Sequence, residues 1–247
     1  MRLSVIVPAY NEAKSLWENV NKFNDYLRVQ DFDYEIIIVN DGSRDETGRI
    51  AADLARENSK IRLLDNEINR GKGAAVRQGI LAANGDFRLF IDADNATAVD
   101  HLDKVWPLFA VGRDIVIGSR NSRDAVSTRI MVGQPFWKII LGKAGNFFIR
   151  GLAVKGIRDT QCGFKVFTKE AALDIFSRTR VSRWAIDVEI LALAQSKNLK
   201  IGIIPVHWKN SGKSRVGIGG YLSTLVEVLK IKFGFITKKY SSKNVRK

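Results

Sequence analysis

The sequence contains too few cysteines and histidines for several common kinds of site. Its single cysteine, Cys162, excludes an internal disulfide and is typical of a reducing compartment, so we expect an inert structural thiol. Its two histidines, His101 and His207, argue against a zinc site and against a Ser-His-Asp triad. We expect both histidines to be surface or packing residues.

Long apolar runs are also missing. The longest stretch without Asp, Glu, Lys or Arg covers residues 216–226, which is 11 residues against the roughly 20 that a transmembrane helix needs. The first residues enter a β-branched apolar run directly and show no signal peptide. We therefore expect a cytoplasmic protein that is soluble or peripheral to a membrane.

Two nucleotide-binding fingerprints are absent after the first apolar run. Neither Gly-x-Gly-x-x-Gly nor Gly-x4-Gly-Lys-Ser/Thr occurs there, and Gly71-Lys72-Gly73 is too short for either. The sequence therefore argues against a dinucleotide-binding dehydrogenase and against a P-loop protein.

The net charge of +14 is concentrated in two zones. Residues 120–160 carry eight Lys or Arg against two Asp, and residues 197–247 carry twelve against Glu227 alone. Zones of this kind face an anionic partner such as phosphates, acidic lipid or nucleic acid. No recognition-helix or RNA-binding signature accompanies them, so we expect no nucleic-acid partner.

Apolar β-branched runs alternate with helical patterns in the first half of the chain. We predict strands at residues 3–7, 35–39, 61–64, 89–91 and 114–117, and helices over about 13–29, 43–58 and 74–83. Ser43 with Glu46 three residues later predicts a capping box for the second helix. This alternation implies right-handed crossovers and an α/β fold with a mostly parallel central sheet and helices on both faces.

Two carboxylates one residue apart, Asp92 and Asp94, end the fourth predicted strand. Ligands bind at the carboxyl edge of such sheets, where Asp41, residues 70–73 and Arg120 would also gather. An Asp-x-Asp pair is common in turns for local hydrogen-bonding reasons. One or two carboxylates together with phosphate oxygens also suit Mg²⁺ or Mn²⁺. The mixture of acids, bases and glycines at this edge favours a phosphorylated nucleotide with a metal.

Six segments in order resemble known sequence signatures. Residues 5–12 (VIVPAYNE), 38–43 (IVNDGS), 69–73 (NRGKG) and 92–94 (DAD) resemble the successive motifs of family-two inverting glycosyltransferases with the GT-A fold. Within that family, residues 159–165 (DTQCGFK) and 183–189 (RWAIDVE) are similar to the dolichyl-phosphate β-glucosyltransferases, relatives of the dolichyl-phosphate mannose synthases.

The resemblance implies a nucleotide-sugar site at this edge. Pro8, Tyr10 and Glu12 would line the nucleotide pocket, Asp41 would contact the uracil or the ribose, and Lys72 would bind the nucleotide sugar. Residues 213–216 resemble the family's Ser-Lys-Val loop, with Arg215 in place of the lysine, and would close over the diphosphate as a lid.

The resemblance also implies a metal site. Asp92 would approach the ribose and the metal, and Asp94 would bind the Mg²⁺ or Mn²⁺ that bridges the diphosphate. Some mannose synthases supply a glutamine ligand two residues after the second Asp, where this chain has Ala96. Water or Thr97 would then complete the metal shell.

The implied acceptor is the phosphate of a polyprenyl (dolichyl-type) lipid. Arg120 and Arg129 would hold that phosphate, because similar arginines do so in the mannose synthases and the guanidinium fork matches phosphate oxygens. Asp187 and Glu189 lie in the region where relatives with hydroxyl acceptors keep a catalytic base, and Asp187 would orient the sugar, a buried arginine or the acceptor. The candidate catalytic residues are thus Asp94, Arg120, Arg129 and Asp187.

The expected activity is transfer of glucose from UDP-glucose to a polyprenyl phosphate with inversion. GDP-mannose or UDP-N-acetylglucosamine as donor, a saccharide acceptor, and a non-catalytic nucleotide-sugar or lipid-binding module stay open as alternatives. Each of them is compatible with the same acidic edge.

Both basic zones mix lysine and arginine with large apolar residues. Ile218, Leu222, Leu225, Leu229 and Phe233 recur at helical spacing near Lys230 and Lys239, and a similar mixture covers residues 129–155. Cationic amphipathic helices suit an anionic membrane surface, and core packing with a solvated face gives the same pattern. We predict a GT-A domain over residues 1–217, with an amphipathic acceptor-side insert at about 121–158, and a basic amphipathic helix and tail over 218–247.

Overall fold

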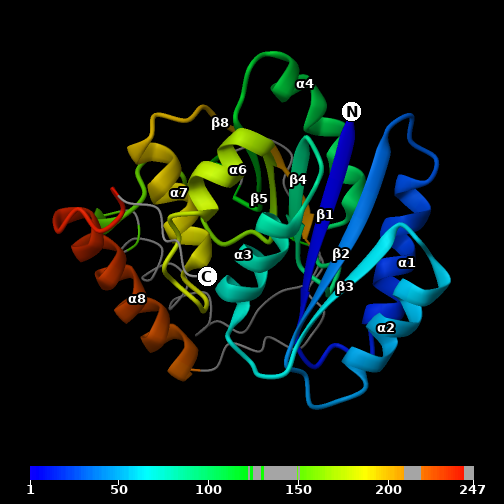
Figure 1. The fold of residues 1–247 in the computed structure, drawn as a ribbon. Coiled ribbons are helices and arrows are strands. Elements are labelled where there is room, and N and C mark those ends of the chain that lie inside the picture. Colours follow the sequence, from blue (N-terminus) through cyan, green and yellow to red (C-terminus); the bar gives the residue numbers. More distant parts are fainter. Residues whose placement is uncertain (122, 125–128, 131–148, 150, 209–217, 242–247) are drawn as a thin grey trace.

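Seven strands form the central sheet of the computed structural model (Figure 1). They are β1 (Arg2–Ala9), β2 (Asp33–Asp41), β3 (Ile61–Asn66), β4 (Phe87–Ile91), β5 (Ile115–Ser119), β7 (Phe164–Thr168) and β8 (Ile201–Pro205). Their order in the sheet is β3-β2-β1-β4-β7-β5-β8. The structure describes residues 1–121, 123–124, 129–130, 149, 151–208 and 218–241, and the side chains of Arg129, Ile130, Ile218, Tyr221 and Leu222 are outside that description.

The five strands predicted from the sequence are confirmed as β1 to β5. Their central residues are apolar and β-branched because both faces of the sheet are covered, so Val5, Ile6 and Val7 are all fully buried. Every pairing in the sheet is parallel except those of β7, which runs antiparallel between β4 and β5. The predicted mostly parallel sheet is therefore confirmed, and β7 and β8 are additions that the sequence patterns did not predict.

Helices cover both faces of the sheet, as predicted (Figure 1). On one face lie α1 (Leu16–Leu27), α2 (Thr47–Glu57), η1 (Val99–Lys104) and α4 (Trp106–Ala110), whose buried or partly buried residues join the core of Val5 and Val7. On the other face lie α3 (Lys72–Ala82), α6 (Lys169–Phe176) and α7 (Ile186–Ser196), which pack with Ile6. Adjacent residues of β1 thus enter two separate cores, as the alternation of side chains along a strand requires.

The predicted capping box is wrong. Ser43 does not cap α2, because its Oγ accepts a hydrogen bond from Asn11 N at 2.9 Å. The helix begins at Thr47, whose backbone N–H donates to the Asp45 carboxylate at 3.0 Å. Helix α1 similarly begins at Leu16 rather than near residue 13. Both errors concern the ends of helices, where side-chain partners decide the first turn.

The last described helix, α8 (Ile218–Ile236), confirms the helical spacing predicted for the second basic zone. Its Val228 and Ile231 are fully buried and join the core that contains α7. In the described part of the chain, no helix combines the length and the apolar character needed to cross a membrane. A two-stranded parallel sheet of β6 (Arg129–Ile130) and β9 (His207–Trp208) completes the fold. The predicted insert at 121–158 lies largely outside the described residues.

Candidate active site

The acidic pair, Asp92 and Asp94, lies in the turn that follows β4, at the carboxyl edge of the sheet. Asp92 N donates to Gly163 O at 3.2 Å, which fixes the start of this turn on the residue before β7. Asn95 adopts a φ of 50°, and Asp94 Oδ1 accepts from Ala96 N at 3.0 Å. Local hydrogen bonds of this kind are what an Asp-rich turn uses to fold back. The Asp92 side chain stays 36% exposed, so the turn presents a carboxylate at the surface of the edge.

Gly163 lies against the Asp92 carboxylate. A Cβ atom at residue 163 would fall 1.8 Å from Asp92 Oδ2, so no other residue fits there without moving the carboxylate. Gly163 belongs to the 159–165 motif, and no role was predicted for it from the sequence. The antiparallel strand β7, which was not predicted from the sequence, brings this glycine to the acidic pair.

Lys72 lies in the first turn of α3 and connects the acidic pair to α7. Its Nζ is 2.9 Å from Asp92 Oδ1 and 3.7 Å from Asp187 Oδ2. The ammonium also lies 5.0 Å from the centre of the Phe90 ring. Burial opposes the charge, but the carboxylates of Asp92 and Asp187 outweigh it and raise the pKa of Lys72. The side chain is therefore a fixed cation at the sheet edge.

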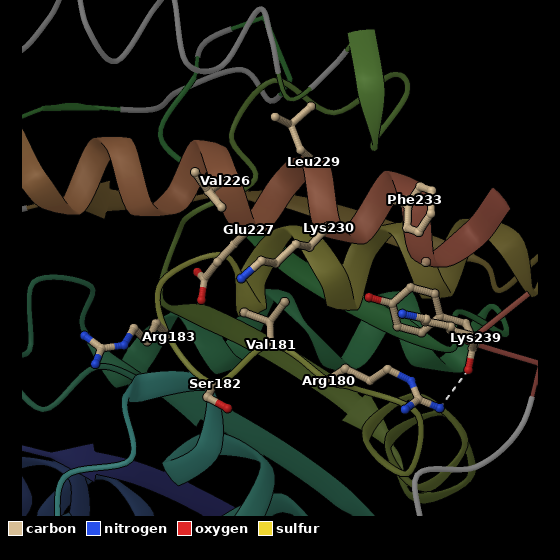
Figure 2. A pocket seen from close by; sticks show the side chains of 12 residues that line it. Arg180, Val181, Ser182, Arg183, Val226, Glu227, Leu229, Lys230, Phe233 and Lys239 are labelled. Carbon is tan, nitrogen blue, oxygen red and sulfur yellow. Dashed lines mark hydrogen bonds between the residues drawn. The ribbon is translucent and has the colours of Figure 1, made fainter. Parts of the chain in front are cut away.

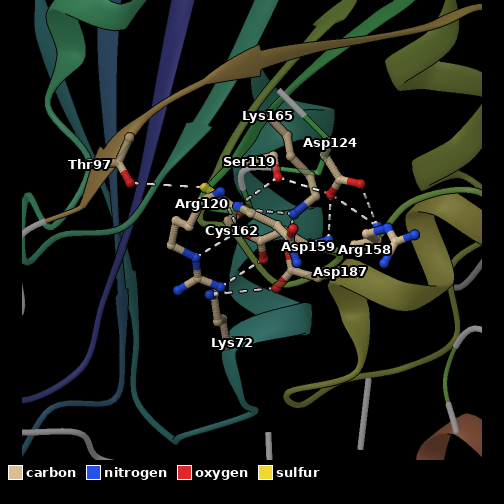
Figure 3. Close-up of polar contacts among 11 residues, drawn as sticks. Lys72, Thr97, Ser119, Arg120, Asp124, Arg158, Asp159, Cys162, Lys165 and Asp187 are labelled. Carbon is tan, nitrogen blue, oxygen red and sulfur yellow. Dashed lines mark hydrogen bonds and ion pairs between the residues drawn. The ribbon is translucent and has the colours of Figure 1, made fainter. Parts of the chain in front are cut away.

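Asp187 is buried and ion-paired. Its Oδ1 accepts a hydrogen bond from Lys165 Nζ, and the same ammonium donates to Cys162 O at 2.6 Å (Figure 3). The side chains of Lys165 and Asp187 are 0% and 3% exposed. A carboxylate that is held between the ammonium groups of Lys165 and Lys72 neutralises and orients them. Asp187 is thus placed to position Lys72. This role was not predicted from the sequence, because it depends on the pairing of Asp187 with Lys165, a residue with no predicted role.

Arg120 leaves the end of β5 and is held by Asp159. Its Nε and one terminal nitrogen each lie 2.8 Å from an oxygen of that carboxylate, and its backbone N donates to the carboxylate at 2.7 Å (Figure 3). Burial opposes ionisation of both groups, but their attraction raises the pKa of Arg120 and lowers the pKa of Asp159. A side-on pair of this kind uses one edge of the guanidinium, and the other terminal N–H groups point away from it. The guanidinium also lies 5.5 Å from the centre of the Trp208 ring.

Asp124 in turn holds Asp159. Its carboxylate accepts from the backbone N–H groups of Arg158 and Asp159 and from Ser119 Oγ, at 2.8 to 3.1 Å. The polar cluster therefore extends from the end of β5 to the segment before β7 (Figure 3). Neither acid was predicted as a site residue, because Asp124 stands outside any motif and Asp159 opens the 159–165 motif without an assigned role.

The loops after β1 and β2 are held side by side at the carboxyl edge of the sheet. Glu12 N donates to Thr47 Oγ1 at 2.7 Å, next to the contact between Asn11 and Ser43. Pro8 lies near the end of β1 and Tyr10 follows that strand, and all three predicted lining residues are half-buried. The structure thus brings Pro8, Tyr10 and Glu12 to one place, and their contact with a nucleotide stays a prediction.

Asp41 shapes the loop that precedes α3. Its carboxylate accepts from Gly71 N at 2.8 Å, from Arg70 N at 2.9 Å and from Asn69 Nδ2 at 3.0 Å. The side chain is almost fully buried at 3% exposure. These three bonds set the position of Lys72, one residue further on. The predicted contact of Asp41 with the uracil or ribose is untested.

Two predicted residues fall outside what the structure describes. Arg215 belongs to the range 209–217, and the side chain of Arg129 is likewise not described, although the backbone of Arg129 pairs with His207 in the β6–β9 sheet. The lid over 213–216 and the second acceptor arginine therefore stay predictions.

The donor set fits a divalent cation that is shared with a substrate. The described residues contain no cluster of three or more His, Cys, Asp or Glu side chains that would form a complete site. Two carboxylates at one turn leave most coordination positions to water and phosphate oxygens, which is how Mg²⁺ is usually held. Thr97 is buried, its Oγ1 lies 3.9 Å from Cys162 Sγ, and Ala96 offers no ligand. Asp92 and Asp94 are thus the residues that would hold the ion.

A family model for Glycosyl transferase family 2 matches residues 4–176 of the chain. The chain belongs to this family. The expected resemblance is thereby confirmed, and so is the prediction that the protein is an enzyme, a glycosyltransferase.

Two dolichyl-phosphate beta-glucosyltransferases are similar to this glycosyltransferase over most of both chains. It is 38% identical to a dolichyl-phosphate beta-glucosyltransferase of Dictyostelium discoideum, over 95% of this chain and 75% of that one. It is 35% identical to the dolichyl-phosphate beta-glucosyltransferase of Homo sapiens, over 100% of this chain and 79% of that one.

Solved structures confirm the GT-A fold of the glycosyltransferase. The mannosyl-3-phosphoglycerate synthase of Rubrobacter xylanophilus has a TM-score of 0.70 at 16% identity, over 100% of this chain and 77% of that chain. A glucosyl-3-phosphoglycerate synthase from Mycobacterium tuberculosis, solved with Mn²⁺, UDP and phosphoglyceric acid, has a TM-score of 0.68 at 16% identity, over 99% and 80% of the two chains.

Proposed function

We propose that this glycosyltransferase moves glucose from UDP-glucose to a polyprenyl phosphate with inversion at the anomeric carbon. One observation supports a phosphate acceptor in particular, which family membership alone does not specify. The resemblance places the base of relatives with hydroxyl acceptors in the region of Asp187 and Glu189, and both are buried. Asp187 is paired with Lys165 and Lys72, and Glu189 accepts from two backbone N–H groups. A hydroxyl acceptor must lose a proton during attack, whereas a phosphate acceptor does not. The names of the two dolichyl-phosphate relatives support the same acceptor and the same sugar.

The acceptor phosphate supplies its own nucleophile. The second pKa of a phosphomonoester is near 6, so the group is largely dianionic at neutral pH. A lone pair of one phosphate oxygen forms the new bond to the anomeric carbon, while the bond from that carbon to the UDP oxygen breaks and UDP leaves with the electron pair. The protein's task is to align the two groups and to balance their charge.

Arg120 is the residue that we assign to the acceptor phosphate. Asp159 holds the Nε and Nη2 edge of its guanidinium, so the terminal edge, formed by Nη1 and the second N–H of Nη2, can donate two parallel hydrogen bonds to phosphate oxygens. Lys72 supplies a second fixed cation, beside Asp92, and we assign it to the donor diphosphate. Asp92 and Asp94 would hold Mg²⁺ or Mn²⁺, as the Mn²⁺–UDP complex of the related fold supports. When bound, the ion would neutralise charge on the departing diphosphate.

A screen of donors and acceptors tests the proposal. Purified protein with Mn²⁺ receives radiolabelled UDP-glucose, GDP-mannose or UDP-N-acetylglucosamine, each with a short polyprenyl phosphate or with a free saccharide. We expect a lipid-soluble β-glucosyl phosphate from UDP-glucose. Transfer to the saccharide alone, or a preferred GDP-mannose donor, would contradict the assignment. Binding of the lipid without turnover by any donor would identify a binding module instead.

We also propose that the enzyme is peripheral to the cytoplasmic face of a membrane, where a polyprenyl phosphate is found. The support is the outer face of α8. Val226, Leu229, Phe233 and Ile236 are 49% to 67% exposed there, near Lys230 and Lys239. A helix that exposes large apolar residues among lysines binds anionic lipid through both.

Sedimentation with vesicles checks this docking. We expect the protein to pellet with phosphatidylglycerol-containing vesicles at low salt, and about 0.5 M NaCl to weaken that association, because salt screens the lysines. The double substitution L229D/F233D should abolish pelleting. Val111→Asp is the matched control, because Val111 is 69% exposed at the end of α4, on a different part of the molecule (Figure 1). Equal pelleting by both variants would contradict the role of α8.

A further inference from the structure

The segment that joins α6 to α7 lies between α8 and the first turn of α3. On one side, residues 180–183 and α8 form an open groove (Figure 2). On the other side, Ser182 O accepts from Ala74 N at 3.1 Å. A Cβ atom on Gly71 would lie 2.4 Å from Ser182 O, and one on Gly73 would lie 2.7 Å from Val181 O. Lys72, between these two glycines, therefore depends on where the 181–182 backbone lies.

Glu189 holds this backbone from the interior. It lies in the first turn of α7 and is fully buried. Its Oε1 accepts from Arg180 N at 2.9 Å, and its Oε2 accepts from Val181 N at 3.0 Å. Within the described ranges, no lysine, arginine or histidine forms an ion pair with this carboxylate, unlike Asp187 two residues earlier. Its partners are thus two backbone N–H groups and one hydroxyl.

That hydroxyl belongs to Tyr240, in the turn that follows α8. Tyr240 Oη donates to Glu189 Oε1 at 2.6 Å. Its ring lies against Gly234, where a Cβ atom would approach it to 2.7 Å, and its centre is 4.6 Å from that of Phe235. Arg180 donates in return to Lys239 O at 2.7 Å (Figure 2). A single carboxylate therefore joins the turn after α8 to the backbone that contacts α3.

We propose that Glu189 is a positioning residue for the donor site and that Tyr240 makes this positioning depend on the docking of α8. Glu189 fixes residues 180–182 against Gly71 and Gly73, and so fixes Lys72 beside Asp92. The Tyr240 hydroxyl completes the carboxylate's hydrogen bonds only while the turn after α8 packs on Gly234 and Phe235 of that helix. The inference rests on the proposed function in taking Lys72 and the acidic pair as the donor site. It links the helix assigned to the membrane with the residues assigned to the nucleotide sugar.

The substitution Tyr240→Phe tests the link, because it removes the hydroxyl and leaves the ring on Gly234. We expect faster hydrogen exchange in residues 71–76 and 180–183, and about fivefold weaker binding of UDP with Mn²⁺ by calorimetry, the effect of losing one hydrogen bond. Tyr34→Phe is the matched control. Tyr34 is also 7% exposed, and its hydroxyl donates to Asn24 Oδ1 at 2.8 Å in the N-terminal half of the fold.

The control should lose stability without changing exchange at 71–76 or the affinity for UDP. Glu189→Gln should weaken UDP binding more than Tyr240→Phe, because an amide N–H would face the backbone N–H groups. Unchanged UDP affinity in Tyr240→Phe, or an equal loss in Tyr34→Phe, would overturn the inference and leave the proposed function standing. A wild-type chain that binds neither UDP nor GDP with Mn²⁺ would contradict the donor assignment itself.

Discussion

Replacing Asp94 by alanine is expected to lower glucosyl transfer about 10³-fold, since a bound cation contributes several kcal/mol to the leaving of a diphosphate. Asp94 is one of two carboxylates at the turn, and its Oδ1 accepts from Ala96 N. Because of this hydrogen bond, Asp94→Ala can lower activity by disturbing the turn as well as by removing a metal ligand. Asp94→Asn separates the two effects, because the amide keeps an acceptor oxygen for Ala96 N but loses the charge.

We expect both variants to lose Mn²⁺-dependent UDP binding and turnover alike. The control is Asp100→Asn, because Asp100 is a carboxylate with 66% exposure in η1 and should leave both readouts unchanged. Steady-state transfer at several Mn²⁺ concentrations is the measurement. Activity retained by Asp94→Asn and lost by Asp94→Ala would show that Asp94 serves the turn, and the metal assignment would then be wrong.

Replacing Arg120 by lysine is expected to lower kcat/KM for polyprenyl phosphate about 100-fold, because two charge-assisted hydrogen bonds are lost. Lysine keeps a positive charge near the buried Asp159, so the variant avoids leaving that acid without a cation. A single ammonium cannot hold the carboxylate by two bonds and also offer two parallel donors to a phosphate. The loss should therefore concern the acceptor, with UDP binding unchanged.

Separate titrations of donor and acceptor measure this division. Arg123→Lys is the control, because Arg123 is exposed on the same loop and its backbone N donates to Asn121 Oδ1. That variant should resemble the wild type in both titrations. A variant Arg120→Lys with normal acceptor kinetics and weaker UDP binding would place Arg120 on the donor side instead.

The first half of the fold could be predicted because its strands are buried on both faces. Residues 5–7, 36–39 and 89–91 are continuous apolar runs, and only a central parallel strand or a short buried helix carries such a run. The acidic pair follows from the same logic, since carboxylates at the end of a central strand are placed at the ligand edge. The order of elements thus gave the position of the site.

β7 could not be predicted from its local sequence, because the strand depends on contacts with residues that are distant in the sequence. The segment Phe164–Thr168 has Lys165 at its second position, and a lysine argues against a central strand. Lys165 is tolerated there because Asp187, 22 residues later, pairs with it in the interior. The roles of Gly163 and Asp159 were hidden for the same reason, because each depends on a partner that only the folded chain brings near.

The antiparallel placement of β7 has a consequence for synthesis of the protein. β4 and β5 emerge from the ribosome first, and the strand that separates them emerges only after the segment 120–163. Until then, Leu89, Phe90 and Val116 lie on strands with unpaired edges, which are the kind of surface that other chains add to. In the nascent chain, β4 and β5 must stay apart until β7 fills the space between them. The sheet next to the acidic pair is therefore incomplete until residues 164–168 have been made.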